Sequence, residues 1–386
     1  MNARRAVLIL KHAVIFHRLA EDPLIGALLR LYEAEGEASA YEAAAAIARS
    51  LYPQGTDLAE AVFQRMIEDD NIYARQCAQG KQPDAALRGQ LVMELEALSW
   101  AVEHAVCKEG YPAWAVGHTD FMNRFDARMQ HVATQGYGPF ASHRVFTVDA
   151  GGMLVPVRHP DPIALSDLYG YELERGKVLA NTRALLSCLP ASNMLLYGDA
   201  GTGKSSTVKA VANEFASSGL RLIQIEKQRL NTIPALLDEL AENPLKFILF
   251  IDDLSFASGD GHFNALKTVL EGSVAARPSN VVVYATSNRR HLISETFSAR
   301  TGDEIHISDT LQEIAGLSAR FGMIVTFGKP DKDEYIRLVL RLAKKSGLAA
   351  TEDELIAEAE AFAIRSGGRS PRTARHYIDG RISMEK

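Results

Sequence analysis

The sequence lacks the features that identify membrane, secreted and metal-rich proteins. Its three cysteines, Cys77, Cys107 and Cys188, are far apart, and no pair has the spacing of a redox motif or a metal site. The apolar stretch within residues 1–20 is interrupted by basic side chains and is followed by no small-residue cleavage site, which excludes a membrane span and a signal peptide. We therefore expect reduced thiols and a cytoplasmic location.

An excess of positive charge is also missing. The formal net charge is −6, so the chain as a whole has no attraction to nucleic acid or to an anionic membrane, although a local basic patch is not excluded. The sequence has no internal repeat and no low-complexity tract. With 47% hydrophobic and 23% charged residues in 386, the composition is that of a globular protein with two or three domains.

The character of the sequence changes near residue 145. Before it, apolar residues recur at steps of three and four, which predicts a helical domain over residues 1–142. Residues 143–160 alternate around an Asp-Ala-Gly-Gly turn and predict a β-hairpin or linker. Strand-like and helical runs then alternate over 161–328, which predicts a parallel sheet with helices on both faces. The last part, 329–386, is helical again.

A glycine-rich stretch, LLYGDAGTGKSSTVKAV, interrupts this α/β region. It fits the phosphate-binding pattern G-x-x-x-x-G-K-[ST], with a strand expected before it and a helix after it. Backbone N–H groups of such a loop point at phosphate oxygens, the lysine reaches the β- and γ-phosphates, and the serine hydroxyl ligates Mg²⁺. A glycine-rich turn with a chance lysine is the alternative. The candidate nucleotide-binding residues are Gly198, Asp199, Ala200, Gly201, Thr202, Gly203, Lys204, Ser205 and Ser206.

Two acidic residues end the strand-like run KFILFIDD. Carboxylates at the end of a buried strand are costly unless a cation neutralises them, so we expect Asp252 to hold Mg²⁺ together with Ser205. Asp253 is expected to orient or deprotonate the attacking water. The next strand-like run, VVVYATSN, ends in Asn288, whose amide would reach the γ-phosphate or the water. A helix cap or turn is the alternative for the two aspartates.

In this order, the motifs resemble those of the AAA+ ATPases, and within them a bacterial group of ATP-binding proteins known as a domain of unknown function. The resemblance covers residue 165 to the C-terminus. It implies a P-loop fold with a parallel five-stranded sheet and a C-terminal helical lid. In the sequence, the all-helical N-terminal domain precedes this fold. It also implies Mg²⁺-dependent ATP hydrolysis by a homo-oligomer, a ring or a filament.

The resemblance assigns roles to further residues. Arg320, in GLSARFGMIV, is at the position of an arginine finger that acts on a neighbouring subunit's nucleotide, and Arg372, in GRSPRTARHYI, is at the position of a lid arginine. A surface salt bridge is the alternative for Arg320, and a solvated or nucleic-acid-binding basic face is the alternative for Arg372. The segment LSDLYGYE matches the one that covers the adenine, which implies base contacts from Leu168, Tyr169 and Gly170.

The sequence departs from the AAA+ pattern in two places. Many members have glutamate where Asp253 stands, and the shorter side chain favours slow hydrolysis. The segment QIEKQRLNTIPALL has no aromatic residue where protein-threading members carry a pore loop, which argues against a peptide translocase. We therefore expect an ATPase that assembles or remodels an unknown partner, held by the N-terminal helices.

Two other functions remain open at this stage. One is a nucleotide-gated binding module with little turnover. The other is a DNA-associated, loader-like factor, which Arg289, Arg290 and the C-terminal arginines permit but the acidic balance does not support.

Overall fold

The computed structural model describes residues 1–105, 109–254, 266, 270, 278–288, 319–348 and 350–385. Three residues singled out in the sequence, Cys107, Arg289 and Arg290, lie outside these ranges. In the part that is described, no helix is both long enough and apolar enough to cross a membrane.

The chain divides into two compact units. The first comprises Met1–His143 with Asn243–Leu245, and the second comprises Arg144–Glu242 with Lys246–Lys386. Each unit is described by itself below.

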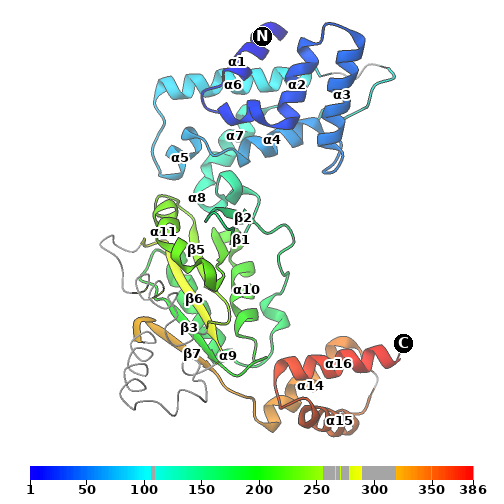
Figure 1. Cartoon of the computed structure of the whole chain (residues 1–386), viewed down its shortest axis with the longest axis vertical. Coiled ribbons are helices and arrows are strands. Elements are labelled where there is room, and N and C mark those ends of the chain that lie inside the picture. Colours follow the sequence, from blue (N-terminus) through cyan, green and yellow to red (C-terminus); the bar gives the residue numbers. More distant parts are fainter. Residues whose placement is uncertain are drawn as a thin grey trace. The chain divides into compact units, whose positions relative to one another are not determined.

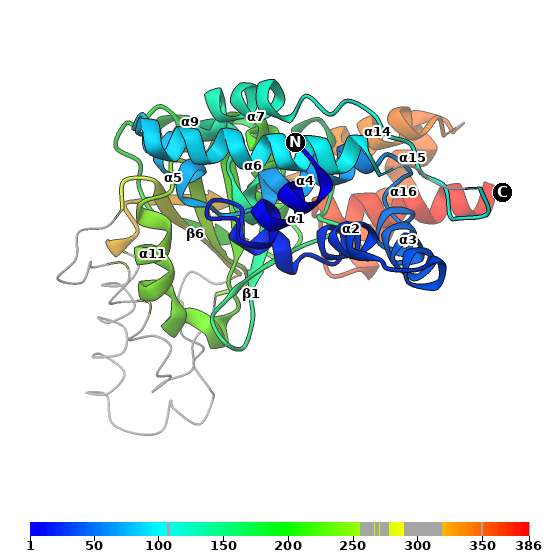
Figure 2. The same ribbon diagram turned by 90° about the horizontal axis from the view of Figure 1, so that it is seen from above.

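The first unit is helical. Its elements are α1 (Ala3–Lys11), η1 (His17–Glu21), α2 (Pro23–Glu33), α3 (Glu37–Leu51), α4 (Leu58–Glu68), α5 (Ile72–Ala78), α6 (Ala85–Glu103), α7 (Phe121–Gln130), α8 (Val132–Gln135) and η2 (Gly138–Ala141). Helix α1 packs against α6, and α2 packs against α3 (Figure 2). Polar side chains fix where these helices begin. Asp22 accepts hydrogen bonds from the N–H groups of Leu24 (2.8 Å) and Ile25 (3.2 Å) at the start of α2.

A buried carboxylate holds the turn after α1. The side chain of Glu94, in α6, is fully buried and accepts hydrogen bonds from the backbone N–H groups of Val14 (2.7 Å), Ile15 (3.1 Å) and Phe16 (2.9 Å). Gln90 donates a further one at 2.7 Å. Since a buried charge is tolerated only when it is fully hydrogen-bonded, Glu94 and this turn stabilise one another.

The second unit is built on a seven-stranded sheet in the order β2-β1-β4-β5-β6-β3-β7 (Figure 1). All neighbouring strands are parallel except β1 and β2, which are antiparallel. The strands are β1 (Val145–Val148), β2 (Leu154–Pro156), β3 (Met194–Gly198), β4 (Leu220–Gln224), β5 (Lys246–Ile251), β6 (Val281–Ser287) and β7 (Met323–Phe327). The fold prediction of a five-stranded parallel sheet is confirmed for β3 to β7, and the hairpin extends that sheet because β1 pairs with β4.

Helices cover both faces of the sheet. The helical elements of this part are η3 (Leu165–Asp167), α9 (Glu172–Leu186), α10 (Lys204–Glu214), η4 (Ala216–Ser218), η5 (Lys227–Thr232) and α11 (Ile233–Ala241). Alternate strand residues such as Leu196, Phe250 and Val325 form one core with Val208 and Val211 of α10. Helix α9 contributes to the same core, whereas α11 packs on the opposite face (Figure 1).

Three helices, α14 (Lys332–Ser346), α15 (Glu352–Arg365) and α16 (Pro371–Glu385), form the C-terminal lid with a hydrophobic core of their own. Asp331 and Glu334 form a capping box at the start of α14, and Gly347 ends that helix at φ 67°. The link from the sheet to the lid is short, residues 328–331.

Candidate functional site

The glycine-rich loop joins β3 to α10 and leaves the start of α10 open. Helix α10 begins at Lys204 without a side-chain cap on its first N–H groups. These groups and the positive end of the helix dipole therefore face the adjoining cavity, as an anion site requires. Gly198 has φ 140°, and a Cβ there would lie 1.9 Å from the carbonyl oxygen of Phe327, so only glycine fits where the loop passes β7.

Lys204 is surrounded by oxygen atoms and is only 5% exposed. Its Nζ donates hydrogen bonds to the carbonyl oxygens of Gly198 (2.8 Å) and Asp199 (2.7 Å) and to Oδ1 of Asn288 (2.9 Å). Burial lowers the pKa of this lysine, while the nearby carboxylates oppose the shift. Because the direct acceptors are neutral, a negative ligand would gain from replacing them.

The acidic end of β5 lies beside the start of α10. Oδ1 of Asp252 accepts hydrogen bonds from the hydroxyls of Ser205 (2.5 Å) and Thr286 (2.6 Å). Thr286 also accepts from the N–H of Asp253 at 2.9 Å, and Oδ1 of Asp253 accepts from the amide of Asn288 at 2.7 Å. The three strand ends thus bring together the residues predicted from the separate motifs. Thr286 is an addition, whose signal was its place one residue before the end of the β6 run.

This donor set fits magnesium. A hydroxyl and a carboxylate, Ser205 and Asp252, meet next to a space for phosphates, and Mg²⁺ is usually held by one or two such oxygens together with substrate phosphates and water. Within the described ranges, no group of three or more His, Cys, Asp or Glu residues is placed to hold a metal by itself.

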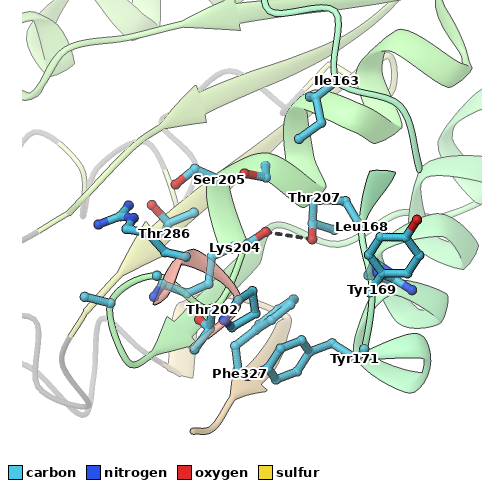
Figure 3. Close-up of a pocket in the computed structure, with 18 of the residues that line it drawn as sticks. Ile163, Leu168, Tyr169, Tyr171, Thr202, Lys204, Ser205, Thr207, Thr286 and Phe327 are labelled. Atoms are coloured by element: carbon cyan, nitrogen blue, oxygen red, sulfur yellow. Dashed lines mark hydrogen bonds between the residues drawn. The ribbon is translucent and has the colours of Figure 1, made fainter. Parts of the chain in front are cut away.

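A cavity of about 480 Å³ joins these elements. Figure 3 shows Lys204, Ser205 and Thr286 at one end and Leu168 and Tyr169 at the other. Of the residues predicted from the sequence, those that line it are Leu168, Tyr169, Gly170, Ala200, Gly201, Thr202, Gly203, Lys204, Ser205, Ser206, Asp252, Asp253, Asn288 and Arg372. Gly198, Asp199 and Arg320 do not line it.

Cationic side chains from several elements face this cavity. Besides Lys204, they are Arg175 from α9 and both Arg372 and Arg375 from α16. Burial lowers the pKa of Arg175. Neither Arg175 nor Arg375 was predicted from the sequence to belong to this site. Arg375 was detectable, since it follows Arg372 by three residues and so shares its face of α16.

The lid touches the phosphate loop directly. The N–H of Arg372 donates to the carbonyl oxygen of Gly201 at 3.2 Å. Gly201 has φ 79°, and a Cβ there would lie 3.0 Å from both Cβ of Arg372 and Oγ of Ser370. A second contact is the ion pair between Lys345 of α14 and Asp167 at 2.6 Å, which lowers the pKa of Asp167. The lid therefore contacts the glycine-rich loop through backbone packing, and residues 165–167 through charge.

Tyr171 lies where the segment 168–170, the sheet and the link to the lid meet. Its hydroxyl donates to the carbonyl oxygen of Gly328 at 2.6 Å, and its ring lies 5.2 Å from that of Phe327 (Figure 3). Its backbone is left-handed, at φ 58° and ψ 34°, which costs a residue other than glycine about 1–2 kcal/mol. The role of Tyr171 could not be predicted from the sequence, since no periodicity marks a tyrosine with a left-handed backbone.

Arg320 stands just before β7, is partly exposed and lies outside the cavity. Within one chain, the structure therefore does not bring this arginine to the other predicted site residues.

Comparisons with known proteins place the second unit of the chain in a family. A family model described as "Protein of unknown function (DUF815)" matches residues 141–384. No curated protein matches the chain. Among solved structures, the chain is similar to the Thermotoga maritima RuvB Holliday junction branch migration motor, with 17% identity and a TM-score of 0.38 over 56% of this chain and 63% of that one. A variant of the same motor gives 18% identity and a TM-score of 0.36 over the same shares. The chain thus spans less than two thirds of those proteins.

Proposed function

We propose that this chain, which belongs to the DUF815 family of proteins of unknown function, binds ATP with Mg²⁺ and hydrolyses it as an ATPase of the AAA+ type. The observation that supports the proposal best is the meeting of three things at one cavity. These are the open start of α10, the buried Lys204, and the pair formed by Ser205 and Asp252. Together they provide the helix dipole, the cation and the metal ligands that binding of a nucleoside triphosphate with Mg²⁺ requires.

In this proposal, the position of each residue in the cavity decides its role in binding or hydrolysis. Lys204 exchanges its carbonyl partners for the β- and γ-phosphate oxygens, and the N–H groups at the start of α10 bind the same phosphates. Ser205 and Asp252 hold Mg²⁺, which neutralises the charge that develops on the phosphates. Asp253 and Asn288, joined by a 2.7 Å hydrogen bond, orient the attacking water. Leu168, Tyr169 and Gly170 contact the base at the far end.

A matched set of variants tests this assignment. Lys204→Ala removes charge-assisted hydrogen bonds worth about 1.5–3 kcal/mol each, so the affinity for a fluorescent ATP analogue should fall at least tenfold. Asp253→Asn should keep that affinity and lower turnover by about 10²–10⁴-fold, the range of a lost general base. Lys209→Ala is the control, because Lys209 is in the same helix but pairs with Asp161 at 3.7 Å. If Lys204→Ala and Asp253→Asn both behave like the wild type, the site is wrongly assigned.

Assembly is the second part of the proposal. Because Arg320 lies outside its own chain's cavity, we propose that it acts on the nucleotide of a neighbouring copy in a ring or filament. Such a finger contributes about 10³–10⁵ in rate. Specific activity should then rise with protein concentration in the wild type and stay low at every concentration in Arg320→Ala. Activity that is independent of concentration in the wild type argues against a residue acting between subunits.

A nucleotide-gated switch with little turnover is the second candidate. It is favoured by Asp253, whose short carboxylate is already engaged by Asn288, and by the contact of the lid with Gly201. Slow turnover with a large ATP-dependent change in oligomer size would favour the switch. In either case, we propose that the protein acts in the cytoplasm, which supplies ATP and Mg²⁺, and that its partner binds the N-terminal helices.

A further inference from the structure

Tyr171 connects three parts of the second unit that are far apart in the sequence. It directly follows the segment 168–170, which lines the nucleotide cavity, and it precedes α9. Its hydroxyl reaches Gly328, the first residue after β7, at 2.6 Å. Gly328 begins the link to the lid, so this one hydrogen bond joins the segment next to residues 168–170 to the segment that connects the sheet with the lid.

The same link is tied to the phosphate loop. The carbonyl oxygen of Phe327 accepts a hydrogen bond from the N–H of Asp199 at 3.2 Å, and Gly198 passes so closely that a Cβ would overlap that oxygen. The ring of Phe327 packs on Tyr171 at 5.2 Å between centroids. The end of β7 is therefore held on one side by the phosphate loop and on the other by Tyr171.

A second cavity, of about 620 Å³, adjoins the contact between Tyr171 and Gly328. Tyr171, Gly328 and Pro330 line it, together with Arg337 and Arg341 of α14. Tyr169, Gly170, Tyr171 and Pro371 line both this cavity and the nucleotide cavity. The two spaces therefore adjoin at residues 169–171, and a displacement of these residues would change the shape of both.

The backbone of Tyr171 supports a specific use of this position. It is one of three described residues other than glycine with positive φ, and glycine or asparagine is normally found in that conformation. The burial of the phenol raises its pKa, so the hydroxyl keeps its proton and remains a donor. Such a conformation persists only where the surrounding structure holds it, and here the ring of Phe327 and the carbonyl oxygen of Gly328 are the contacts of the side chain.

We propose that Tyr171 is a positioning residue that couples occupation of the nucleotide cavity to the angle of the lid, through its hydrogen bond to Gly328. The inference rests on the proposed nucleotide binding. A base that fills the cavity presses on 168–170, Tyr171 transmits the displacement to residues 328–331, and the second cavity takes up the movement of α14. Without the hydroxyl, nucleotide still binds, but the lid no longer responds.

Hydrogen–deuterium exchange separates binding from this response. In the wild type, Mg²⁺ with a slowly hydrolysed ATP analogue should slow exchange both in the phosphate loop, 199–206, and in the link and first lid helix, 328–341. In Tyr171→Phe, which removes only the hydroxyl, protection of 199–206 should persist while that of 328–341 falls to less than about a third of the wild-type change. The analogue's Kd should change less than about threefold and kcat should fall about threefold to tenfold, the effect of one hydrogen bond.

Two further variants keep the result interpretable. Tyr335→Phe is the matched control, because its hydroxyl donates to the carbonyl oxygen of Ala359 inside the lid, at 3.3 Å, and does not cross the link. It should respond like the wild type. Tyr171→Asn suits the left-handed backbone while removing both ring and hydroxyl, and it should also lose the lid response. It keeps the proposal testable if Tyr171→Phe is poorly folded.

The outcomes are distinct. If the wild type shows no protection of 199–206, the proposed function fails. If that protection is present but 328–341 does not respond in the wild type, or responds in both Tyr171 variants as strongly as in the wild type, the coupling is refuted while nucleotide binding stands. Loss of the response in Tyr335→Phe as well would also overturn the specific role of Tyr171.

Discussion

The side-chain amide of Asn288 accepts a hydrogen bond from Nζ of Lys204 at 2.9 Å. The same amide donates to Asp253 at 2.7 Å, so a single side chain joins the lysine that we propose to bind phosphate to the residue that we propose to orient the water. An amide serves here because it is an acceptor and a donor at once. Binding of phosphate by Lys204 would release the acceptor of Asn288, and the geometry around Asp253 would change with it.

Replacement of this amide should affect turnover more than binding. In Asn288→Ala, Lys204 keeps its two carbonyl acceptors, so the affinity for ATP should change less than about threefold. Asp253 loses its partner, and turnover should fall about 10–100-fold, as expected when a positioning hydrogen bond near the reacting water is lost. Equilibrium binding and single-turnover hydrolysis measure the two effects. A variant that hydrolyses ATP at the wild-type rate would contradict the assignment of Asn288.

Two glycines of the phosphate loop form a matched pair for testing the lid contact. Gly201 (φ 79°) and Gly203 (φ 91°) have similar backbones, but a Cβ would meet Arg372 and Ser370 only at Gly201 and would meet nothing within 4 Å at Gly203. Both alanine variants should bind ATP more weakly because alanine is strained at positive φ. Only Gly201→Ala should also displace the lid, measured as faster hydrogen exchange at residues 370–375. Equal exchange in the two variants would show that the packing does not hold the lid.

The buried position of Lys204 predicts a dependence of ATP binding on pH. Burial lowers its pKa below the ordinary value of 10.5, so the ammonium group begins to lose its proton at a pH where exposed lysines keep theirs. Affinity should therefore fall as pH rises toward 10.5, and the slope should vanish in Lys204→Ala. The stability of the nucleotide-free protein moves in the opposite direction. Since the folded state disfavours the charged form, this lysine's contribution improves as pH rises through the lowered pKa. Affinity that stays constant up to pH 10 would count against direct contact of the lysine with phosphate.

The carboxylate of Glu94 predicts a large effect on the stability of the first unit. Glu94→Gln weakens charge-assisted hydrogen bonds to three backbone N–H groups and should lower the free energy of unfolding by about 2–4 kcal/mol in a denaturant titration. Glu96→Gln, in the same helix but exposed, should stay within about 0.5 kcal/mol of the wild type. Similar stabilities for the two variants would show that the charge is dispensable. ATP binding is not expected to change in either.

Much of the second unit could be predicted because its signals are local. The run KFILFIDD specifies both a buried strand and the acidic end that meets Ser205, and it needs only the parallel arrangement of its neighbours to place those groups together. The glycines before Lys204 specify their loop because few other residues fit it. These elements follow from short-range sterics and strand burial.

Other features could not be predicted because they depend on contacts between distant segments. The pairing of β1 with β4 joins residues 145–147 to 222–224, and the sequence of neither strand specifies its partner. The left-handed backbone of Tyr171 is held by Phe327 and Gly328, more than 150 positions later in the chain. The hydrogen bond between Lys204 and Asn288 likewise depends on β3 and β6 being neighbours in the sheet.

The hairpin has a consequence for how the protein can be divided. Strand β1 covers β4, whose residues are almost all buried, and β2 closes the sheet with only three residues ending in Pro156, which lacks the N–H that a further strand would bind. A fragment cut at residue 161 would expose β4 as a bare apolar margin and invite aggregation. The hairpin thus covers an edge of the sheet that would otherwise be open, and fragments of the second unit intended for expression should keep it.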